Sequence, residues 1–268
     1  MAGAPVFVKL GGSLITDKQR EATARLALLR RLAGEVRRAR EARPDLRLLL
    51  GHGSGSFGHW EAAKYGTQAG VRTAEEWHGF ARVGAAASRL NRLVVETFLD
   101  EGVPVLSLQP SSAAMAEEGR IVAYHLAPIE RALAAGLVPL VFGDVAFDLR
   151  RGGTILSTEA LFVHLAQHLH PSRILLLGNA PGVLDAEHRV IPRITPQSLP
   201  RVEACLRGSN GRDVTGGMAD KVHRMVELAA ALPGLRIWIM SGREPGSLFR
   251  ALTEPEHPQG TCITAEER

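Results

Sequence analysis

Three lysines in this sequence stand close to short glycine-rich stretches, a combination of residue types that suits the binding of phosphate groups. Lys9 precedes Gly11-Gly12-Ser13, Lys18 comes a few residues after that stretch, and Lys221 follows residues 213–218. Glycines let the backbone approach an anion and point its N–H groups at it, while lysine adds positive charge. Lys9 lies within an apolar segment, where an ammonium group needs an anionic partner unless it reaches water.

A further glycine-rich stretch, residues 51–59, follows an apolar segment and ends in His59. The backbone N–H groups of such a loop can bind phosphate at the end of a strand. The histidine adds a side chain that can donate a hydrogen bond near neutral pH. The spacing Gly53-x-Gly55-x-x-Gly58 also fits the dinucleotide-binding fingerprint of dehydrogenases, so this stretch alone leaves two functions open.

The rest of the sequence favours phosphoryl transfer over a dehydrogenase. A dinucleotide site needs an acidic residue about 20 positions further on, at the end of a strand. The candidates, Glu75 and Glu76, fall in a segment whose apolar spacing predicts a helix over residues 73–101. Three glycine-rich turns with three lysines suit a reaction between two phosphate-bearing molecules. A non-catalytic nucleotide-binding or anion-storage protein is a third possibility, although it would not need the three lysines and the histidine together.

Apolar segments alternate with segments of helical periodicity along the chain. The predicted strands cover residues 5–10, 46–50, 103–108, 137–142, 174–177 and 235–240, and the main helices cover residues 21–42, 73–101, 126–135 and 158–168. This alternation predicts an α/β fold, a three-layer α/β/α sandwich with a mainly parallel central sheet. Residues 145–155 predict a small hairpin with Gly152-Gly153 at its turn, and residues 111–120 a loop or a short helix. Ligands bind at the carboxyl ends of strands in such sheets, where Asp144 is expected.

Composition limits the class of protein. The 268 residues are 45% hydrophobic and 22% charged, with 32 basic and 28 acidic residues, as in an ordinary globular protein. We interpret the arginine-rich helix faces as solvated surface and expect neither nucleic acid nor a membrane as partner. Two distant cysteines, Cys205 and Cys262, and the lack of a signal peptide or of an apolar run of about 18 residues favour a cytoplasmic protein. No metal site is predicted, because His164 and His168 lack both the glutamate of HExxH and a third ligand.

Four motifs together resemble the amino acid kinase superfamily over nearly the whole chain. They are Lys9-Leu10-Gly11-Gly12-Ser13, Gly143-Asp144-Val145, Gly182-Val183-Leu184-Asp185 and Asp213-Val214-Thr215-Gly216-Gly217-Met218. The resemblance implies a single domain over residues 1–268. Within it, residues from about 1 to 170 would form the acceptor-binding and dimer-forming half, and residues from about 171 to 268 the nucleotide-binding half. A homodimer is therefore expected.

Residues 53–59 and Leu14-Ile15-Thr16-Asp17-Lys18 further resemble the isopentenyl phosphate kinases, and the histidine that ends the loop is the more discriminating feature. These enzymes convert isopentenyl phosphate and ATP into isopentenyl diphosphate and ADP in isoprenoid biosynthesis, which implies ATP and Mg²⁺ here. Fosfomycin kinases share a similar loop histidine, so a kinase of fosfomycin or of another small phosphate or phosphonate is the alternative. The sequence leaves the acceptor's tail open, although an apolar pocket beside the helix after His59 would suit a five-carbon isoprenoid.

The resemblance also implies roles for individual residues. The residues implied in catalysis are Lys9, Lys18, His59 and Asp144, with Lys18 stabilising charge on the transferred group and Asp144 orienting the lysines. The residues implied to bind ATP are Lys9, Leu10, Gly11, Gly12, Ser13, Gly55, Asn179, Gly182, Asp185, Gly216 and Lys221. The residues implied to bind the acceptor are Ser54, Gly55, Gly58, His59 and Thr158.

The chain departs from the family pattern at two places. Ser157-Thr158-Glu159 stands where the family commonly has Ser-Gly-Asp, which affects the acceptor contacts near Thr158. Asn179-Ala180-Pro181-Gly182 stands where a turn containing aspartate is frequent, which affects the base and ribose contacts. The chemistry itself needs no general base, because a phosphate monoester with a second pKa near ~6 is already a nucleophile at neutral pH. Positioning and positive charge would supply most of the catalysis.

Overall fold

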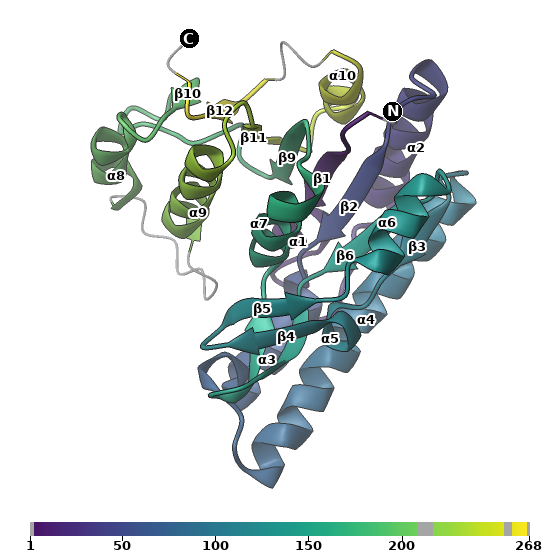
Figure 1. The fold of residues 1–268 in the computed structure, drawn as a ribbon, viewed down its shortest axis with the longest axis vertical. Coiled ribbons are helices and arrows are strands. Elements are labelled where there is room, and N and C mark those ends of the chain that lie inside the picture. Colours follow the sequence, from purple (N-terminus) through teal and green to yellow (C-terminus); the bar gives the residue numbers. More distant parts are fainter. Residues whose placement is uncertain (1–2, 208–216, 255–258, 267–268) are drawn as a thin grey trace.

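An eight-stranded sheet forms the centre of the molecule (Figure 1). The computed structural model describes residues 3–207, 217–254 and 259–266. Within them the strand order is β10-β12-β11-β9-β1-β2-β6-β3, and every neighbouring pair is parallel except β11 with β12. The strands are β1 (Val6–Leu10), β2 (Leu48–His52), β3 (Val105–Ser107), β6 (Val138–Phe142), β9 (Arg173–Gly178), β10 (Arg193–Ile194), β11 (Arg236–Ser241) and β12 (Thr261–Ile263). The predicted mainly parallel sheet is confirmed, and chain segments from both sides of residue 170 contribute strands to it.

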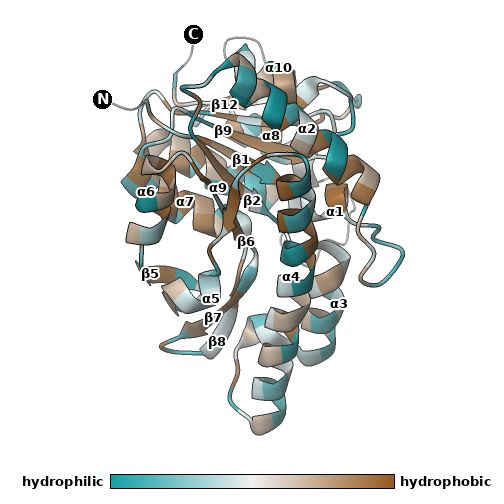
Figure 2. Cartoon of the chain, turned by 90° about the vertical axis from the view of Figure 1, so that its right-hand side faces the viewer, coloured by the Kyte–Doolittle hydropathy of each residue, from teal (hydrophilic) through white to brown (hydrophobic). Residues whose placement is uncertain are grey.

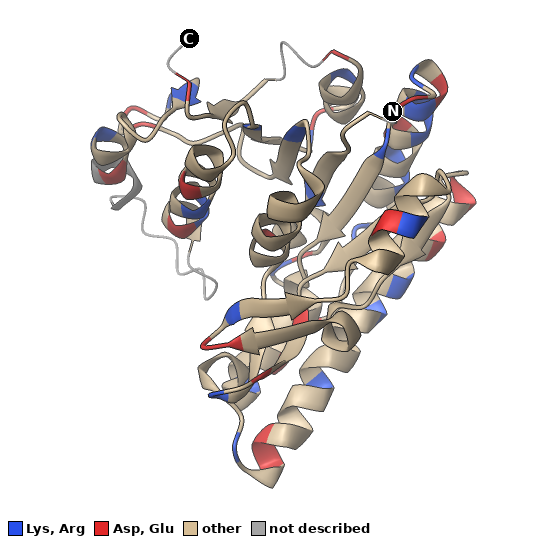
Figure 3. Ribbon diagram, viewed as in Figure 1, with Lys and Arg blue, Asp and Glu red and all other residues tan. Residues whose placement is uncertain are grey.

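Helices cover both faces of this sheet, as the three-layer prediction requires. They are α1 (Gly12–Ile15), α2 (Leu26–Ala42), α3 (Gly55–Tyr65), the 3₁₀ turn η1 (Thr67–Ala69), α4 (Ala74–Asp100), α5 (Pro110–Ala113), α6 (Ala127–Ala134), α7 (Thr158–Leu169), α8 (Leu199–Arg207), α9 (Gly217–Ala231) and α10 (Ser247–Thr253). Figure 2 shows hydrophobic residues concentrated in the central strands, and Figure 3 shows charged residues mostly on helices and loops. In the part of the chain that the structure describes, no helix is both long and apolar enough to cross a bilayer.

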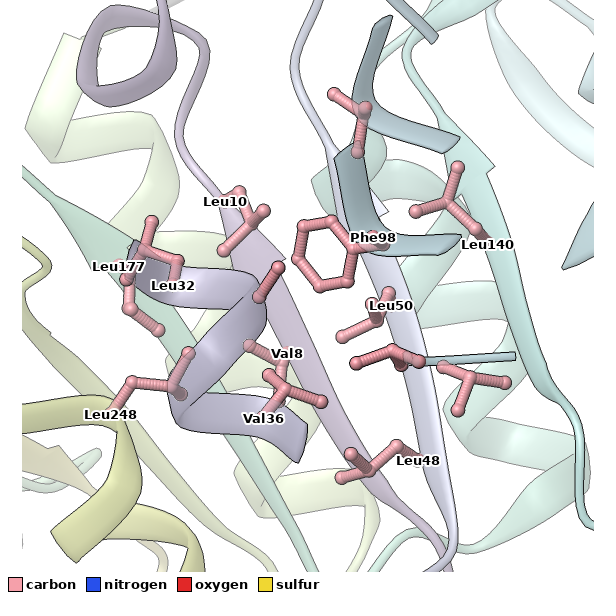
Figure 4. Packing of buried hydrophobic residues seen from close by; sticks show 14 of the residues in the cluster. Val8, Leu10, Leu32, Val36, Leu48, Leu50, Phe98, Leu140, Leu177 and Leu248 are labelled. Atoms are coloured by element: carbon pink, nitrogen blue, oxygen red, sulfur yellow. The ribbon is translucent and has the colours of Figure 1, made fainter. Parts of the chain in front are cut away.

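Alternate side chains of β1 explain how the two faces are packed. Val8 and Leu10 point to one face, where they join a cluster with residues of α2, α4 and α10 that includes Leu32, Val36, Phe98 and Leu248 (Figure 4). Phe7 points to the other face and packs on Phe162 of α7, with 5.2 Å between the ring centroids. Each fully buried leucine or phenylalanine contributes about 1.5–3 kcal/mol to folding, so both helix layers are held firmly against the strands.

A second, four-stranded sheet of order β5-β4-β7-β8 lies beyond one end of the large sheet (Figure 1). Its strands are β4 (Ala114–Glu117), β5 (Arg120–Tyr124), β7 (Asp144–Asp148) and β8 (Gly152–Leu156). The predicted hairpin is confirmed, but Gly152 and Gly153 belong to β8, so the turn falls earlier, at residues 149–151. The carboxylate of Asp148 closes that turn by accepting the backbone N–H groups of Arg150 and Arg151. The prediction of a loop or short helix at 111–120 was wrong beyond α5, because β4 pairs with β5 and with the distant β7.

The glycine-rich stretch 51–59 is mostly not a loop. Its first two residues end β2, and its last five form the first turns of α3, so only Gly53 and Ser54 connect strand and helix. Gly55 adopts a φ of +50°, and a Cβ there would lie 2.3 Å from Oγ1 of Thr16. The glycine therefore allows both the tight turn and the close approach of the segment after α1. The predicted helix 21–42 likewise begins only at Leu26.

Candidate active site

Two lysines from different parts of the chain converge on one carboxylate. Lys9 is the second-last residue of β1 and is only 7% exposed, and its Nζ donates a hydrogen bond to Oε1 of Glu159. Nζ of Lys221, in the second turn of α9, lies 3.9 Å from the same oxygen. Glu159 is therefore the anionic partner that the buried position of Lys9 demanded.

The two lysines keep Glu159 ionised. Burial alone would raise the pKa of this carboxyl group, but the charges of Lys9 and Lys221 and the hydrogen bond from Lys9 lower it to about 2. At neutral pH the three side chains thus carry one net positive charge. Sequence analysis did not select Glu159, although the departure Ser157-Thr158-Glu159 marked its position, because nothing local shows that α7 brings it to β1 and α9.

The lysines open onto a pocket of about 220 Å³ at the carboxyl ends of β1, β9 and β11. Its lining residues are Lys9, Ser13, Leu176, Leu177, Gly178, Asn179, Ala180, Gly217, Met218, Lys221 and Ile239. Four residues predicted to bind ATP, namely Lys9, Ser13, Asn179 and Lys221, are therefore brought together. Gly216 lies outside the described residues.

The glycine-rich turns after β1 and β2 are in direct contact. A Cβ on Gly12 would lie 2.6 Å from the backbone nitrogen of Gly55, and one on Gly53 would lie 3.0 Å from the nitrogen of Gly12. Side chains at these positions would force the two turns apart. Gly11 donates its N–H to the carbonyl of Leu177 in β9. The predicted phosphate-binding turns consequently form one continuous edge beside the lysine pocket, while Leu10 is buried beneath it.

Lys18 and His59 lie on two segments that are tied together. His59 is half-buried in α3, one turn after Ser54 and Gly55, and Lys18 is exposed after α1. The backbone N–H of Ser56 donates to Oγ1 of Thr16 at 3.0 Å, which holds the start of the Lys18 segment against α3. Gly58 is required by close packing in α3, since a Cβ there would lie 2.5 Å from Oγ of Ser54.

Thr158 and Asp144 have structural partners. The Thr158 hydroxyl is 1% exposed and donates to the carbonyl oxygen of His52 at 2.7 Å, so it supports the glycine turn from beneath. The Asp144 carboxylate accepts the N–H groups of Ser111 and Val145, and burial raises its pKa despite these hydrogen bonds. Among the described residues, Glu159 rather than Asp144 contacts both Lys9 and Lys221. The catalytic role of Asp144 and the acceptor contact of Thr158 stay predictions.

His52 is a supporting residue that sequence analysis missed. It is fully buried at the end of β2, and its ring stacks on Phe142 with 5.5 Å between centroids. Nδ1 lies 3.1 Å from the carbonyl oxygen of Gly53, to which it donates, and Nε2 lies 3.1 Å from Oδ1 of Asn91. Burial lowers the pKa of His52, and the hydrogen bond from Nδ1 fixes the backbone of the turn.

Asn179, Gly182 and Asp185 shape the turn that follows β9. The Asn179 side chain donates to the carbonyl of Ser13. A Cβ on Gly182 would lie 2.7 Å from Oγ1 of Thr261, so this position is packed too tightly for any other residue. The Asp185 carboxylate accepts hydrogen bonds from the backbone and side chain of Arg189, which lower its pKa. Asp185 thus holds its own turn together, and its predicted contact with ATP stays a prediction.

An apolar cluster lies between α4 and the small sheet. It contains Val71, Phe80, Val83 and Val145, and Ala62 of α3, Trp77 and Ile155 pack against it. α3 carries His59 near its middle and packs along α4, so this helix connects the cluster to the predicted phosphate-binding residues.

The described side chains include no group of three or more histidine, cysteine, aspartate or glutamate residues that could hold a metal ion. His164 and His168 contact each other, with 4.8 Å between their ring centroids. Mg²⁺ binds proteins through one or two carboxylates plus substrate phosphates, so a metal that arrives with ATP needs no such cage. The pocket that holds Lys9 and Lys221 is lined by hydroxyl, amide and ammonium groups, so the phosphates of ATP would supply most of the ligands of such a metal.

Comparison with known proteins agrees with this geometry. The model of the amino acid kinase family matches residues 5–241. The isopentenyl phosphate kinase of Haloferax volcanii is 37% identical over 250 residues, covering 91% of this chain and 98% of the relative. The isopentenyl phosphate kinase of Methanothermobacter thermautotrophicus is 34% identical, covering 97% of this chain and 99% of the relative. A solved structure described as an isopentenyl phosphate kinase superimposes with a TM-score of 0.81 at 31% identity, covering 96% of this chain and 99% of that one.

Proposed function

This chain belongs to the amino acid kinase family, and within it we propose that the chain is an isopentenyl phosphate kinase. It transfers the γ-phosphoryl group of ATP to isopentenyl phosphate and releases isopentenyl diphosphate and ADP. The observation that carries this proposal is the convergence of Lys9 and Lys221 on Glu159 beside two touching glycine turns. Such a site offers positive charge and backbone donors to two phosphate-bearing molecules at once.

The geometry supports catalysis by positioning and charge. The acceptor phosphate is itself the nucleophile, so the protein must mainly overcome repulsion between two anions. Lys9 and Lys221 neutralise the ATP phosphates, and the N–H groups of the turns at Gly12 and Gly55 hold the transferred group. His59 donates to the acceptor phosphate, and Lys18, carried by the segment docked on α3, stabilises charge on the transferred group. Mg²⁺, when present with ATP, would supply additional positive charge.

The acceptor's tail follows from the apolar cluster. Phe80, Val83 and Val145 are buried beside the helix that carries His59, and an acceptor tail inserted among them would meet only hydrocarbon, which suits a five-carbon isoprenoid better than the smaller and more polar fosfomycin. The dehydrogenase alternative loses its acidic residue, since Glu76 lies in the first turn of α4 and completes a capping box with Thr73.

The direct test is turnover. We would incubate the purified protein with ATP, Mg²⁺ and isopentenyl phosphate and follow the mixture by phosphorus NMR. New diphosphate resonances with stoichiometric ADP are expected. ATP consumption with fosfomycin but not with isopentenyl phosphate would reassign the acceptor. Intact ATP with both acceptors would refute the proposal.

We also propose a homodimer formed by the amino-terminal half. β3 is an edge strand of the large sheet, and its residue Leu106 is 42% exposed. Leu99, near the end of α4, is 49% exposed. An exposed edge strand with apolar side chains is a surface that a second copy can cover. Light scattering should give twice the mass of one chain, and Leu106→Arg should shift it toward one chain. A wild-type mass of one chain would refute the dimer.

A further inference from the structure

Two residues of α2, Arg31 and Glu35, form hydrogen bonds to the backbone of the segment after β11, residues 242–249. Nη1 and Nη2 of Arg31 donate to three consecutive backbone carbonyls, those of residues 242–244. Glu35 is fully buried, with a side-chain exposure of 0%, and also accepts a hydrogen bond from Arg31 at 2.5 Å. Its two carboxylate oxygens accept the backbone N–H groups of Gly246, Leu248 and Phe249 at 2.9, 3.0 and 3.1 Å. Residues 242–249 therefore have little freedom to move relative to α2.

This clamped segment carries Arg243, which reaches across to the nucleotide pocket. Nε of Arg243 donates to Oδ1 of Asn179 at 2.9 Å, and Nδ2 of Asn179 donates to the carbonyl of Ser13 at 2.9 Å. One orientation of the amide satisfies both contacts, because its oxygen accepts and its nitrogen donates. A single chain of hydrogen bonds thus joins the turns after β11, β9 and β1.

The chain of hydrogen bonds lies at the wall of the nucleotide pocket, not in the hydrophobic core. Asn179 and Ser13 line the pocket that holds Lys9 and Lys221, whereas Arg243 and Asn179 are themselves exposed. Hydrogen bonds between exposed groups add little to folding, because water replaces them when they break. Their effect falls instead on the shape of the pocket wall that a nucleotide meets.

We infer that Arg243 is a positioning residue for the nucleotide: anchored by Arg31 and Glu35, it holds Asn179 and the Ser13 carbonyl in place at the wall of the ATP pocket. This inference rests on the proposed kinase function and adds a residue to it. Arg243 acts through Asn179, so its hydrogen bond matters rather than its charge. The expected cost of losing it is weaker ATP binding with an unchanged chemical step.

The test uses substitutions that separate hydrogen bond from charge. Arg243→Ala should raise both the KM for ATP and the calorimetric Kd for ADP about fivefold, the effect of one hydrogen bond. The value of kcat, the KM for isopentenyl phosphate and the melting temperature should stay at wild-type values. Arg243→Gln should restore ATP binding, because its Nε2 stands the same number of bonds from the backbone as Nε of arginine. The control Arg92→Ala removes an exposed arginine whose Nε also donates a hydrogen bond, to Glu96, and should change nothing.

A double-mutant cycle completes the test. Asn179→Ala should weaken ATP binding at least as much as Arg243→Ala does, because it also removes the contact with the Ser13 carbonyl. The double variant should be no weaker than Asn179→Ala, since Arg243 acts through Asn179. Additive losses, or a glutamine variant as weak as the alanine variant, would overturn the inference. The inference would also be overturned if the wild-type protein binds ADP and the Arg243→Ala variant binds it equally well. Wild-type protein that neither binds ADP nor consumes ATP would instead refute the proposed kinase.

Discussion

The sharpest prediction concerns Glu159→Gln, which removes the negative charge between two lysines. Lys9 has a side-chain exposure of 9% and would lose its ionic partner, while Lys221 would lose a neighbour at 3.9 Å. The pKa of Glu159 falls from the ordinary 4.5 to about 2, and a shift of that size corresponds to about 3 kcal/mol of stability at neutral pH. Removing one partner of a buried ion pair costs a similar amount, about 3–5 kcal/mol. We therefore expect the unliganded variant to melt about 6–12 °C below the wild type.

ATP should reverse much of this loss. Its phosphates bring negative charge to the same lysines. In the variant this charge replaces the missing charge of Glu159, whereas the wild type already has that charge without ATP. Differential scanning fluorimetry with and without MgATP should show a larger ATP-induced rise in melting temperature for Glu159→Gln than for the wild type. Glu117→Gln, which removes an exposed glutamate paired with Arg150, is the matched control and should change neither value. A variant as stable as the wild type, or one with a smaller ATP-induced rise, would refute the reasoning.

The same pair predicts a pH dependence of stability. A carboxyl group whose pKa is lower in the folded state stabilises the fold above its unfolded pKa. That stabilisation is lost as the pH falls from about 4.5 through about 2. The free energy of unfolding of the wild type should therefore fall more steeply over this range than that of Glu159→Gln. Urea titrations at several pH values measure this difference, and parallel curves would contradict it.

Four further substitutions test other parts of the site. Lys18→Ala and His59→Ala should each lower kcat/KM by about 10²-fold or more with little change in melting temperature, because each removes a proposed donor to phosphate; turnover near the wild-type value in both would contradict the assignment. Gly55→Ala should destabilise the protein by about 2 kcal/mol or more, since it combines a φ of +50° with a Cβ only 2.3 Å from Thr16. Urea unfolding measures that loss, and Gly34→Ala, within α2 and with only a side-chain atom at 3.5 Å, serves as its control. Phe80→Ala should raise the KM for isopentenyl phosphate more than the KM for ATP, and equal changes would place the acceptor's tail elsewhere.

Local sequence patterns predicted the class of chemistry and six of the eight strands that form the large sheet in the described residues, but not β10 and β12. Runs such as 137–142 and 174–177 are apolar on both faces, which only a strand covered by helices on both sides requires. Glycines at the ends of these strands indicated phosphate-binding turns, and parallel strands place such turns at one edge without further information. The lysine in β1 also indicated that its ammonium group needs either an anionic partner or a path to water.

Patterns within a short stretch could not identify that partner. Glu159 is 150 residues from Lys9, and an ordinary first-turn glutamate has the same local sequence whether it faces water or a lysine. The joining of β4 to the predicted hairpin escaped prediction for the same reason, because β4 pairs in parallel with β7 across more than thirty residues. The stretch 51–59 looked like a loop by its glycines, yet its last five residues form helix because α3 packs along α4.

The sequence by itself thus determined the alternation of strands and helices, the positions of the glycine-rich turns and the class of chemistry. Only the tertiary structure decided that Glu159 bridges the two lysines and that Thr158 turns its hydroxyl toward His52. It also decided that Arg243 reaches the nucleotide pocket through Asn179. The physical reason is the range of the interactions: periodicity and turn chemistry act between near neighbours, whereas ion pairs and buried hydrogen bonds depend on which distant segments the fold brings together.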